Sequence, residues 1–383
     1  MKSGKRDIQV CTHCVMNSTD ENIIFDENGV CNRCNEFKQR IEPDWNYGKG
    51  HENKLKLLLD AIKKSGKNKE YDCLIGLSGG MDSSFVLHMA VKEWKLRPYV
   101  LHVDAGWDLP ESKENIQKLC NKLGVKLHTK EIDFEDMRQM QIAFFKTSHA
   151  GLDAPQDHAF IAQVDRVADE LDIKYILNGY NISTEIVANP SSWAKGGGPV
   201  GDKTYMKDVL KKHGGIKTKH YDYTTGFRHK FWLPYVRGIK TVHLLNYIPI
   251  TKKEMEDILH KEYGYTLYKQ KHFEDMLTKF LEGWWLPTRF GYDIRIAWLS
   301  SLIITGQMTR SEALAILENP PLSEEESKEL FSSVAKKLKI SEEELMAYHD
   351  MPITYQKYKS NAWAFKIGIK LYTFFGLDKR IRR

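Results

Sequence analysis

The stretch LIGLSGGMDSS, residues 74–84, decides the fold of this chain. It lies between an apolar run and a helical pattern that extends from Ser83 to Leu96, which is where a phosphate site is expected. Its two glycines carry no Cβ, so backbone N–H groups can approach phosphate oxygens closely. Asp82 supplies a carboxylate for Mg²⁺, which prefers hard oxygens and substrate phosphates. We therefore expect a phosphate group with Mg²⁺ to bind at Ser78, Gly79, Gly80, Asp82, Ser83 and Ser84.

On both sides of this loop, short apolar runs alternate with helical patterns. The expected strands are Tyr71–Leu77, Pro98–Val103, Val125–Ile132 and Tyr175–Leu177. The expected helices are Glu52–Ser65, Ser83–Leu96, Glu111–Leu123 and Asp157–Leu171. Such an alternation indicates an α/β fold with a doubly wound parallel sheet, which binds its ligands at the carboxyl ends of the strands.

Four of the six cysteines form two Cys-x-x-Cys pairs separated by sixteen residues, namely Cys11, Cys14, Cys31 and Cys34. Each pair can direct two sulfurs at one point, so this spacing predicts a structural zinc site in a ribbon-like module with a turn at Asn28-Gly29. An iron–sulfur or redox role remains as an alternative, and disulfides are disfavoured in a reducing compartment. Cys73 and Cys120 lie in apolar patterns, which predicts a place in the core.

The remaining patterns divide the chain into three parts. We expect a zinc-ribbon module at residues 1–42, a nucleotide-binding domain at 43–250 and a helical C-terminal region at 251–383. The Gly- and Lys-rich residues 190–230 predict a mobile loop over the site, with an ordered insertion as the alternative. Capping-box sequences at Thr251/Glu254, Thr309/Glu312, Ser323/Glu326 and Ser341/Glu344 support the helical region.

Composition limits the class of protein. The 383 residues are 42% hydrophobic, which excludes fibrous and wholly disordered classes. The formal charge of +6 permits an anionic partner without requiring one. Without a secretory pattern at the start or a run of about 18 apolar residues, we expect a cytoplasmic protein. Residues 365–383 mix aromatic and basic side chains, so we expect them to lie on the body of the protein, with peripheral membrane contact as the alternative.

The sequence Ser-Gly-Gly-x-Asp-Ser after the first strand resembles the PP-loop of the ATP pyrophosphatase superfamily. Its members adenylate a carbonyl-type oxygen, release pyrophosphate and let a nucleophile displace AMP. HVDAGW (102–107) resembles the segment that meets adenosine, which implies roles for Val103 and Asp104; a strand-end cap is the alternative for Asp104. NGYNISTE (178–185) resembles the segment that meets pyrophosphate or Mg²⁺, although Tyr180 replaces a common histidine. This second resemblance implies binding roles for Gly179, Asn181, Thr184 and Glu185.

The nucleophile separates the branches of that superfamily. Sulfur-transferring members use a cysteine near the nucleotide, but the last cysteine of this chain, Cys120, precedes the fourth strand. Nitrogen transfer is therefore favoured. The chain shows no glutaminase pattern, so we expect ammonia to come from another subunit or from solution.

Longer motifs resemble one family, the N-acetyl sugar amidotransferases of bacterial surface-polysaccharide (lipopolysaccharide O-antigen) and flagellin-glycan biosynthesis. They are residues 11–34, APQDHAF (154–160), KQKHFEDMLTKF (269–280) and residues 286–314. The resemblance implies an ATP-dependent enzyme that turns an acetamido group into an acetamidino group. It also implies an N-acetyl sugar substrate, expected to be nucleotide-linked, and separate glutaminase and barrel subunits that supply ammonia. No stable nucleic-acid partner is expected.

Within those motifs, Lys271, His272, Arg289 and Arg295 are the catalytic candidates beside Asp82, because positive charge is needed at the α-phosphate. Each also has a structural reading: Lys271 with Glu274 fits a helix-surface pair, and Arg289 with Asp293 fits an internal salt bridge. Further site candidates are Asp157, His158, Trp193, Trp284 and Trp285, with a helix-terminus charge or core packing as the alternatives.

Two other functions stay open at this point. A zinc ribbon followed by a PP-loop is also the layout of some tRNA thiolases, so a tRNA-modifying enzyme is the main alternative. A nucleotide-binding protein without catalysis is the other, although an intact loop with Asp82 argues against it.

Overall fold

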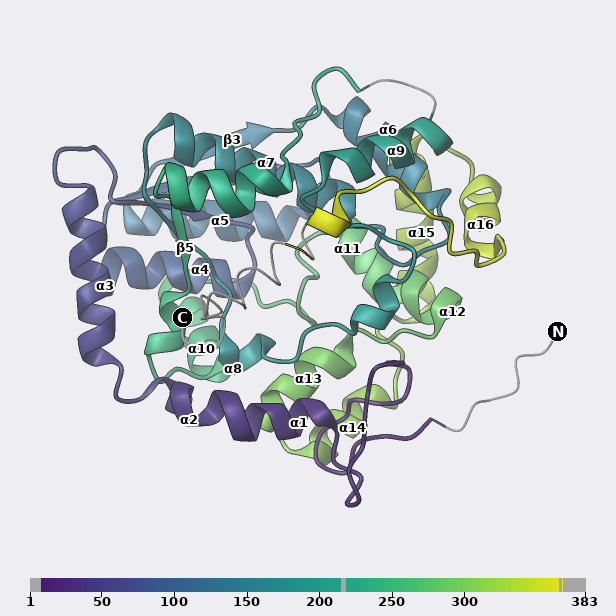
Figure 1. Cartoon of the computed structure of the whole chain (residues 1–383), viewed down its shortest axis with the longest axis horizontal. Coiled ribbons are helices and arrows are strands. Elements are labelled where there is room, and N and C mark those ends of the chain that lie inside the picture. Colours follow the sequence, from purple (N-terminus) through teal and green to yellow (C-terminus); the bar gives the residue numbers. More distant parts are fainter. Residues whose placement is uncertain (1–7, 215–217, 365–366, 368–383) are drawn as a thin grey trace.

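The computed structural model describes residues 8–214, 218–364 and 367, and it contains a parallel sheet with helices around it (Figure 1). Among these residues the sheet has five strands in the order β3-β2-β1-β4-β5, all parallel. The strands are β1 (Cys73–Gly76), β2 (Pro98–Asp104), β3 (Leu127–Glu131), β4 (Tyr175–Leu177) and β5 (Lys240–Val242). The sequence predicted the first four. It missed β5 because this edge strand exposes Lys240 and Thr241 and so lacks an apolar run.

Helices cover both faces of the sheet, which confirms the doubly wound fold. Because side chains alternate along a strand, Cys73 and Ile75 of β1 face one helical layer, whereas Leu74 faces the other. The first layer contains α3 (Glu52–Ser65), α4 (Met81–His88), α5 (Pro110–Leu123) and α10 (Lys252–Tyr263). The second contains α7 (Ala154–Glu170). Because the five strands are parallel, their carboxyl ends all lie at the same edge of the sheet.

The N-terminal module lies beside the C-terminal helices (Figure 1). It contains α1 (Asn32–Glu36) and α2 (Glu42–Trp45), with helical turns at Phe37–Ile41 and Asn46–Gly48. The expected turn is present, and Gly29 adopts φ +75°, which favours glycine. The module is bonded to its neighbours: Ser300 accepts a hydrogen bond from the Val15 N–H at 3.2 Å, and Arg310 Nε donates to the carbonyls of Cys11 and Cys14 at 3.1 Å.

Residues 190–230 contain regular helical elements, which contradicts a long loop and matches the alternative, an ordered insertion. They include a turn at Ser191–Ala194, helix α9 (Lys203–His213) and the start of the turn Arg228–Val236. Helix α9 packs on α6 (Phe134–Phe145) through buried Tyr205, Met206 and Val209. Lysines between these apolar residues hid the helical stripe in the sequence. Residues 215–217 lie outside the described part.

The last third is helical, as predicted. It contains α11 (Met276–Phe280), α12 (Leu286–Phe290), α13 (Arg295–Ile304), α14 (Arg310–Leu317), α15 (Glu324–Leu338) and α16 (Glu342–Asp350), with a wide turn at Leu281–Trp285. Full capping boxes form at Thr251/Glu254, Thr309/Glu312 and Ser323/Glu326, and Ser341 accepts from the Glu344 N–H. The remaining short elements are α8 (Ile182–Glu185), the wide turn Met89–Glu93 and the turn Leu244–Tyr247.

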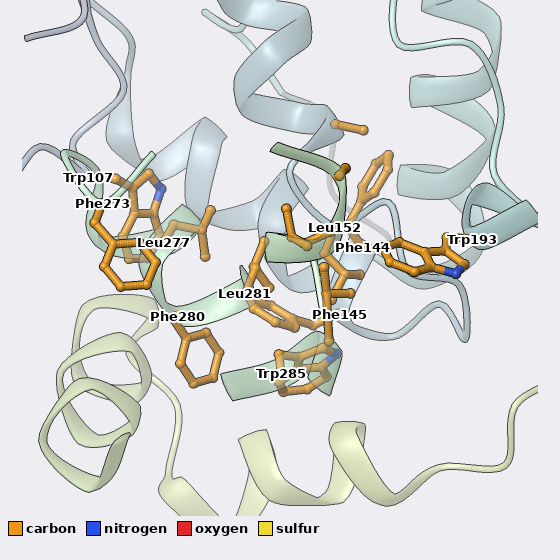
Figure 2. Packing of buried hydrophobic residues seen from close by; sticks show 14 of the residues in the cluster. Trp107, Phe144, Phe145, Leu152, Trp193, Phe273, Leu277, Phe280, Leu281 and Trp285 are labelled. Atoms are coloured by element: carbon orange, nitrogen blue, oxygen red, sulfur yellow. The ribbon is translucent and has the colours of Figure 1, made fainter. Parts of the chain in front are cut away.

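One apolar cluster joins the N-terminal module, α6, α7 and the C-terminal helices. Figure 2 shows its centre, where Phe145 meets Trp285 with ring centroids 4.8 Å apart and Phe280 lies close by. Because this core is shared, the proposed boundaries at 42/43 and 250/251 stay predictions. Within the described residues, no helix combines the length and apolar character needed to cross a membrane. The basic, aromatic residues 365–383 lie outside the described part apart from Ile367.

Candidate functional site

The carboxyl ends of β1, β2 and β4 open into a cavity of about 600 Å³. One wall is the glycine-rich loop, and the opposite wall comes from the C-terminal region. The lining includes Ser78, Gly80, Asp82, Ser83, Val103, Gly179, Thr184, Glu185, Lys271 and His272, all predicted from the sequence. Residues almost 200 positions apart in the chain therefore share one cavity.

Backbone geometry explains both glycines of the loop. Gly79 adopts φ +84°, and a Cβ there would stand 2.3 Å from Ser112 Oγ. A Cβ on Gly80 would stand 2.4 Å from Glu274 Oε1. The Gly79 carbonyl accepts hydrogen bonds from the hydroxyls of Tyr265 (2.5 Å) and Tyr268 (3.1 Å), so the C-terminal region fixes the shape of the loop.

Asp82 is the centre of a charged network at the start of α4. Its Oδ2 lies 2.8 Å from Lys271 Nζ, and its Oδ1 accepts from Asn181 Nδ2 at 3.0 Å. Lys271 Nζ also lies 2.6 Å from Glu185 Oε1 and donates to Thr184 Oγ1 at 3.4 Å. Burial alone would lower the pKa of Lys271, but the two carboxylates outweigh it and hold this pKa above its ordinary value. Lys271 therefore stays charged between Asp82 and Glu185.

The donor set at this point fits a hard divalent cation. Asp82 and Glu185 direct carboxylate oxygens at one position, with the Thr184 hydroxyl beside it, and a lysine ammonium fills that position here. Mg²⁺ is held in proteins by one or two carboxylates together with substrate phosphates. Asp82 and Glu185 are therefore the residues that would hold it.

Gly179 and Asn181 act on the loop from the end of β4. A Cβ on Gly179 would stand 2.9 Å from the Ser83 nitrogen, so a larger residue would push the loop away. Asn181 is almost fully buried and does not line the cavity. Its Oδ1 caps α8 by accepting from the Thr184 N–H, which leaves its Nδ2 pointing at Asp82. Asn181 thus orients Asp82 rather than meeting a ligand.

Besides Asn181, three nucleotide-binding candidates lie outside the cavity lining. Gly79 is buried, and Ser84 is fully buried beside Tyr265. Asp104 accepts from the Gly106 N–H and from Lys113 Nζ, both at 2.7 Å, which matches the strand-end cap. Burial would raise the pKa of Asp104, but Lys113 and the Gly106 N–H hold it below its usual range.

The structure does not bring Arg289 or Arg295 to the cavity, which corrects their assignment to the α-phosphate. Arg295 forms a two-pronged ion pair with Asp293 at 2.9 and 2.7 Å and donates to the Ile316 carbonyl. Arg289 donates to the Met351 carbonyl at 2.9 Å. Both guanidinium groups therefore join C-terminal segments, and the pairing of Arg295 with Asp293 was not the one considered.

His158 and the three tryptophans are structural as well. His158 is fully buried between the Val200 carbonyl and the Thr224 N–H, so it fastens the 190–230 segment. Trp193 stacks on Tyr292 and donates to the Thr19 carbonyl, and neither Trp284 nor Trp285 lines the cavity. Trp298 does line it, although the sequence gave it no distinguishing pattern.

His272 adopts a left-handed backbone, φ +67°, and its Nδ1 lies 3.1 Å from Glu282 Oε1. Burial would lower the pKa of His272, but Glu282 outweighs it and raises this pKa to about 9. The imidazole is therefore protonated and paired near neutral pH. Such a group can donate a proton or stabilise negative charge, but it is not a general base.

The four clustered cysteines fit zinc. The Sγ atoms of Cys14 and Cys31, and of Cys31 and Cys34, are 3.6 Å apart, and those of Cys11 and Cys34 are 4.0 Å apart. Sulfurs about 2.3 Å from a central zinc stand about 3.8 Å apart at the corners of a tetrahedron. All four are buried, which suits a closed, structural zinc site rather than a catalytic one.

We expect the purified chain to contain stoichiometric zinc and no iron, measured by inductively coupled plasma mass spectrometry. Cys31→Ser should lose the metal and melt at a markedly lower temperature, because structural zinc contributes about 10 kcal/mol to folding of small modules. Cys120→Ala, which changes a buried cysteine of α5, is the control and should keep its zinc. Iron in the wild-type protein would contradict the assignment.

Comparison with known proteins finds two domain families, one on each wall of this cavity. Residues 72–183 match the phosphoadenosine phosphosulfate reductase domain, and residues 274–372 match the C-terminal domain of proteins described as LPS biosynthesis protein WbpG-like. The first match contains the glycine-rich loop and strands β1 to β4, so this part of the chain resembles a PP-loop domain. The chain also carries a WbpG-like C-terminal domain, as its motifs predicted.

More distant similarities were also found. A protein of Methanocaldococcus jannaschii named MJ1599, which is uncharacterised, is 25% identical over 173 residues, or 45% of this chain and 59% of that protein. The chain thus spans about three fifths of the curated relative it matches. The U34-tRNA thiolase NcsA of Methanococcus maripaludis, with its [4Fe-4S] cluster, is 13% identical at a TM-score of 0.30, covering 90% of both chains. NH3-dependent NAD synthetase of Campylobacter jejuni is 14% identical at a TM-score of 0.29, covering 73% of this chain and all of that one.

Proposed function

We propose that this protein is an ATP-dependent amidotransferase of bacterial surface-glycan biosynthesis. It adenylates the acetamido carbonyl oxygen of an N-acetyl sugar and replaces that oxygen with ammonia. The products are an acetamidino sugar, AMP and pyrophosphate. The sugar is nucleotide-linked in this proposal, and ammonia comes from separate glutaminase and barrel subunits.

One observation carries the proposal: the two family matches meet in one cavity. Ser78, Gly80 and Asp82 of the PP-loop domain line it together with Asp275 and Glu282 of the WbpG-like domain. A PP-loop supports adenylation, and the description of the C-terminal domain refers to lipopolysaccharide biosynthesis. A cavity built by both supports adenylation of a glycan precursor.

The position of the cysteines supports nitrogen rather than sulfur as the nucleophile. Of the six cysteines, four form the metal cluster, and Cys73 and Cys120 are buried in the core. None of the six lines the cavity. A thiolase that uses its own cysteine at the nucleotide would lack its nucleophile here, which disfavours the tRNA-modifying alternative.

The residues of the site suit the reaction. An amide oxygen is a poor leaving group. Once it is bonded to the α-phosphorus of ATP, it can leave the carbon as part of AMP. Ser78, Ser83 and the loop N–H groups bind the departing pyrophosphate, and Lys271 offsets the charge that develops at the α-phosphate. Mg²⁺, when bound, neutralises phosphate charge. Asn181 and the hydroxyls of Tyr265 and Tyr268 hold Asp82 and the loop in place.

A panel of acetamido-sugar nucleotides tests the proposal. We expect pyrophosphate release from ATP and Mg²⁺ that depends on one such sugar, followed, with ammonium chloride present, by a product in which NH replaces the carbonyl oxygen. Pyrophosphate release is followed by a coupled assay and the product by mass spectrometry. Stimulation by bulk tRNA with no response to any acetamido sugar would contradict the proposal.

A further inference from the structure

The cavity has a second end that adenylation does not use, and acidic side chains line it. Asp153 and Asp157 lie one turn apart at the start of α7 and share the lining with Asp275 and Glu282. Burial, followed by the charge of Glu282, raises the pKa of Asp153 above its usual range. Burial also raises the pKa of Asp275 to about 7. Several carboxyl groups thus share a space in which negative charge is disfavoured.

Two buried oxygen atoms at this end lack a hydrogen-bond donor among the described residues. They are Gln156 Oε1 and Glu282 Oε2. Gln156 is 4% exposed and Glu282 is 8% exposed, and both line the cavity. The Gln156 amide hydrogen-bonds the Asp275 carboxyl, and Glu282 Oε1 is paired with His272. A buried acceptor without a donor is costly, so this end of the cavity suits a ligand that brings donors.

We propose that this acidic end, formed by Asp153, Gln156, Asp157 and Glu282, binds ammonium and converts it to ammonia for the adenylated sugar. An ammonium ion carries one positive charge and donates hydrogen bonds without accepting any, which matches a pocket of acceptors. The inference rests on the proposed function, because it assigns a place to the nucleophile of that reaction.

A monovalent donor suits this end better than a second Mg²⁺. Glu282 holds His272 in the protonated state at its edge, and a divalent ion is repelled by that charge more strongly than a monovalent one. Mg²⁺ also requires near-ideal octahedral oxygen geometry and retains several waters. Asp82 and Glu185 at the other end already provide carboxylates for it.

The chemistry balances with Asp157 as the base. A proton leaves ammonium nitrogen for an Asp157 carboxylate oxygen. The freed lone pair forms a C–N bond with the carbon of the O-adenylyl imidate, and one N–H proton moves to the imidate nitrogen. The C–O bond to AMP then breaks with its electron pair leaving on AMP, and the amidinium remains.

The surroundings of Asp157 support this role. Burial, and then the charge of Asp153, raises the pKa of Asp157 well above its usual range. Asp275 and Glu282 act in the same direction, whereas His272 acts in the opposite one. A carboxylate with a raised pKa is a stronger base than an exposed one. At lower pH it becomes protonated and no longer binds the cation, so ammonium use should fall as the pH falls.

The test compares two nucleophiles in Asp157→Asn. Ammonium must lose a proton before it attacks, whereas hydroxylamine is uncharged at neutral pH. We expect the variant to lose about a hundredfold in kcat/KM for ammonium chloride, the range of general-base effects, but less than about threefold with hydroxylamine. The kcat/KM of the variant for total ammonium should rise about tenfold per pH unit, because the concentration of free ammonia rises by that factor. The kcat/KM of the wild type should depend less on pH once Asp157 is ionised. The amide keeps the size and shape of the side chain, so the variant should fold.

The controls separate this inference from the proposed function. Glu325→Gln, an exposed carboxylate in the first turn of α15, should match the wild type with both nucleophiles. Sugar-dependent exchange between ATP and labelled pyrophosphate needs no ammonia, so it reports adenylation alone. Its absence in the wild type would overturn the proposed function, and the inference with it. Three results for Asp157→Asn would overturn the inference alone while the exchange stays intact. The variant could lose kcat/KM equally with both nucleophiles, or lose none with either. Its loss with ammonium could also be restored by added MgCl₂.

Discussion

Asp82→Asn should reduce sugar-dependent pyrophosphate release by about a thousandfold or more. A single preorganised electrostatic contact contributes about 10²–10³ in rate, and Asp82 would provide two, one with Lys271 and one with Mg²⁺. It is the carboxylate at the start of α4 that would hold Mg²⁺, and its Oδ2 positions Lys271 Nζ at 2.8 Å. The amide keeps the shape of the side chain but lacks the charge that both interactions need. The measurement is the initial rate of pyrophosphate formation at saturating ATP, sugar and Mg²⁺.

The variant should still fold, because Lys271 keeps Glu185 as a partner at 2.6 Å. A melting temperature within a few degrees of the wild type would show this. Asp60→Asn changes an exposed carboxylate of α3 and should leave the rate unchanged. If Asp82→Asn released pyrophosphate at more than about a tenth of the wild-type rate, neither role assigned to Asp82 could be correct.

The parts of the fold that local signals define were predictable. Strands β1 to β4 and helix α3 follow from apolar runs and from helical periodicity, and the C-terminal helices follow from capping boxes that the structure contains. Helix α9 and strand β5 were missed because lysines interrupt their apolar patterns. The packing of Tyr205 and Met206 on α6, rather than a local signal, identifies α9.

The site divides in the same way. The glycine-rich loop carries its own chemistry in consecutive residues, so Ser78, Gly80 and Asp82 could be found from sequence. One sequence does not reveal the tertiary contacts that bring distant side chains to the loop. Lys271 and Arg295 looked equally suitable, yet one is held between two carboxylates and the other is neutralised by Asp293.

The hydrogen bonds from Tyr265 and Tyr268 to the Gly79 carbonyl could not be predicted from the sequence either. Nothing in the sequence distinguishes these two tyrosines from tyrosines that only pack in the core. Their role is visible only in the structure, where residues 265–275 lie beside the loops that follow β1 and β2: the two hydroxyls reach the Gly79 carbonyl, and Asp275 forms a backbone bridge with Asp108. The C-terminal region therefore completes the nucleotide end of the cavity as well as its acidic end.

Lys271→Met should lower both stability and activity. The side chain is 12% exposed and lies between Asp82 and Glu185, so its loss leaves two carboxylates facing each other without a cation. Breaking a buried ion pair by removing one partner costs about 3–5 kcal/mol. Loss of the charge at the α-phosphate should also reduce pyrophosphate release by about 10²–10³-fold. Denaturant unfolding measures the first effect and the pyrophosphate assay the second.

Lys271→Arg separates the two effects. A guanidinium keeps the charge, so most of the stability should return, but it spreads that charge over a planar fork and cannot place a compact ammonium between Asp82 and Glu185. Activity should therefore stay well below that of the wild type. Lys253→Met is the control, because this α10 lysine is 77% exposed and its pair with Asp257 contributes little. Full activity in Lys271→Arg would mean that the charge alone matters, whereas full activity in Lys271→Met would remove Lys271 from the mechanism.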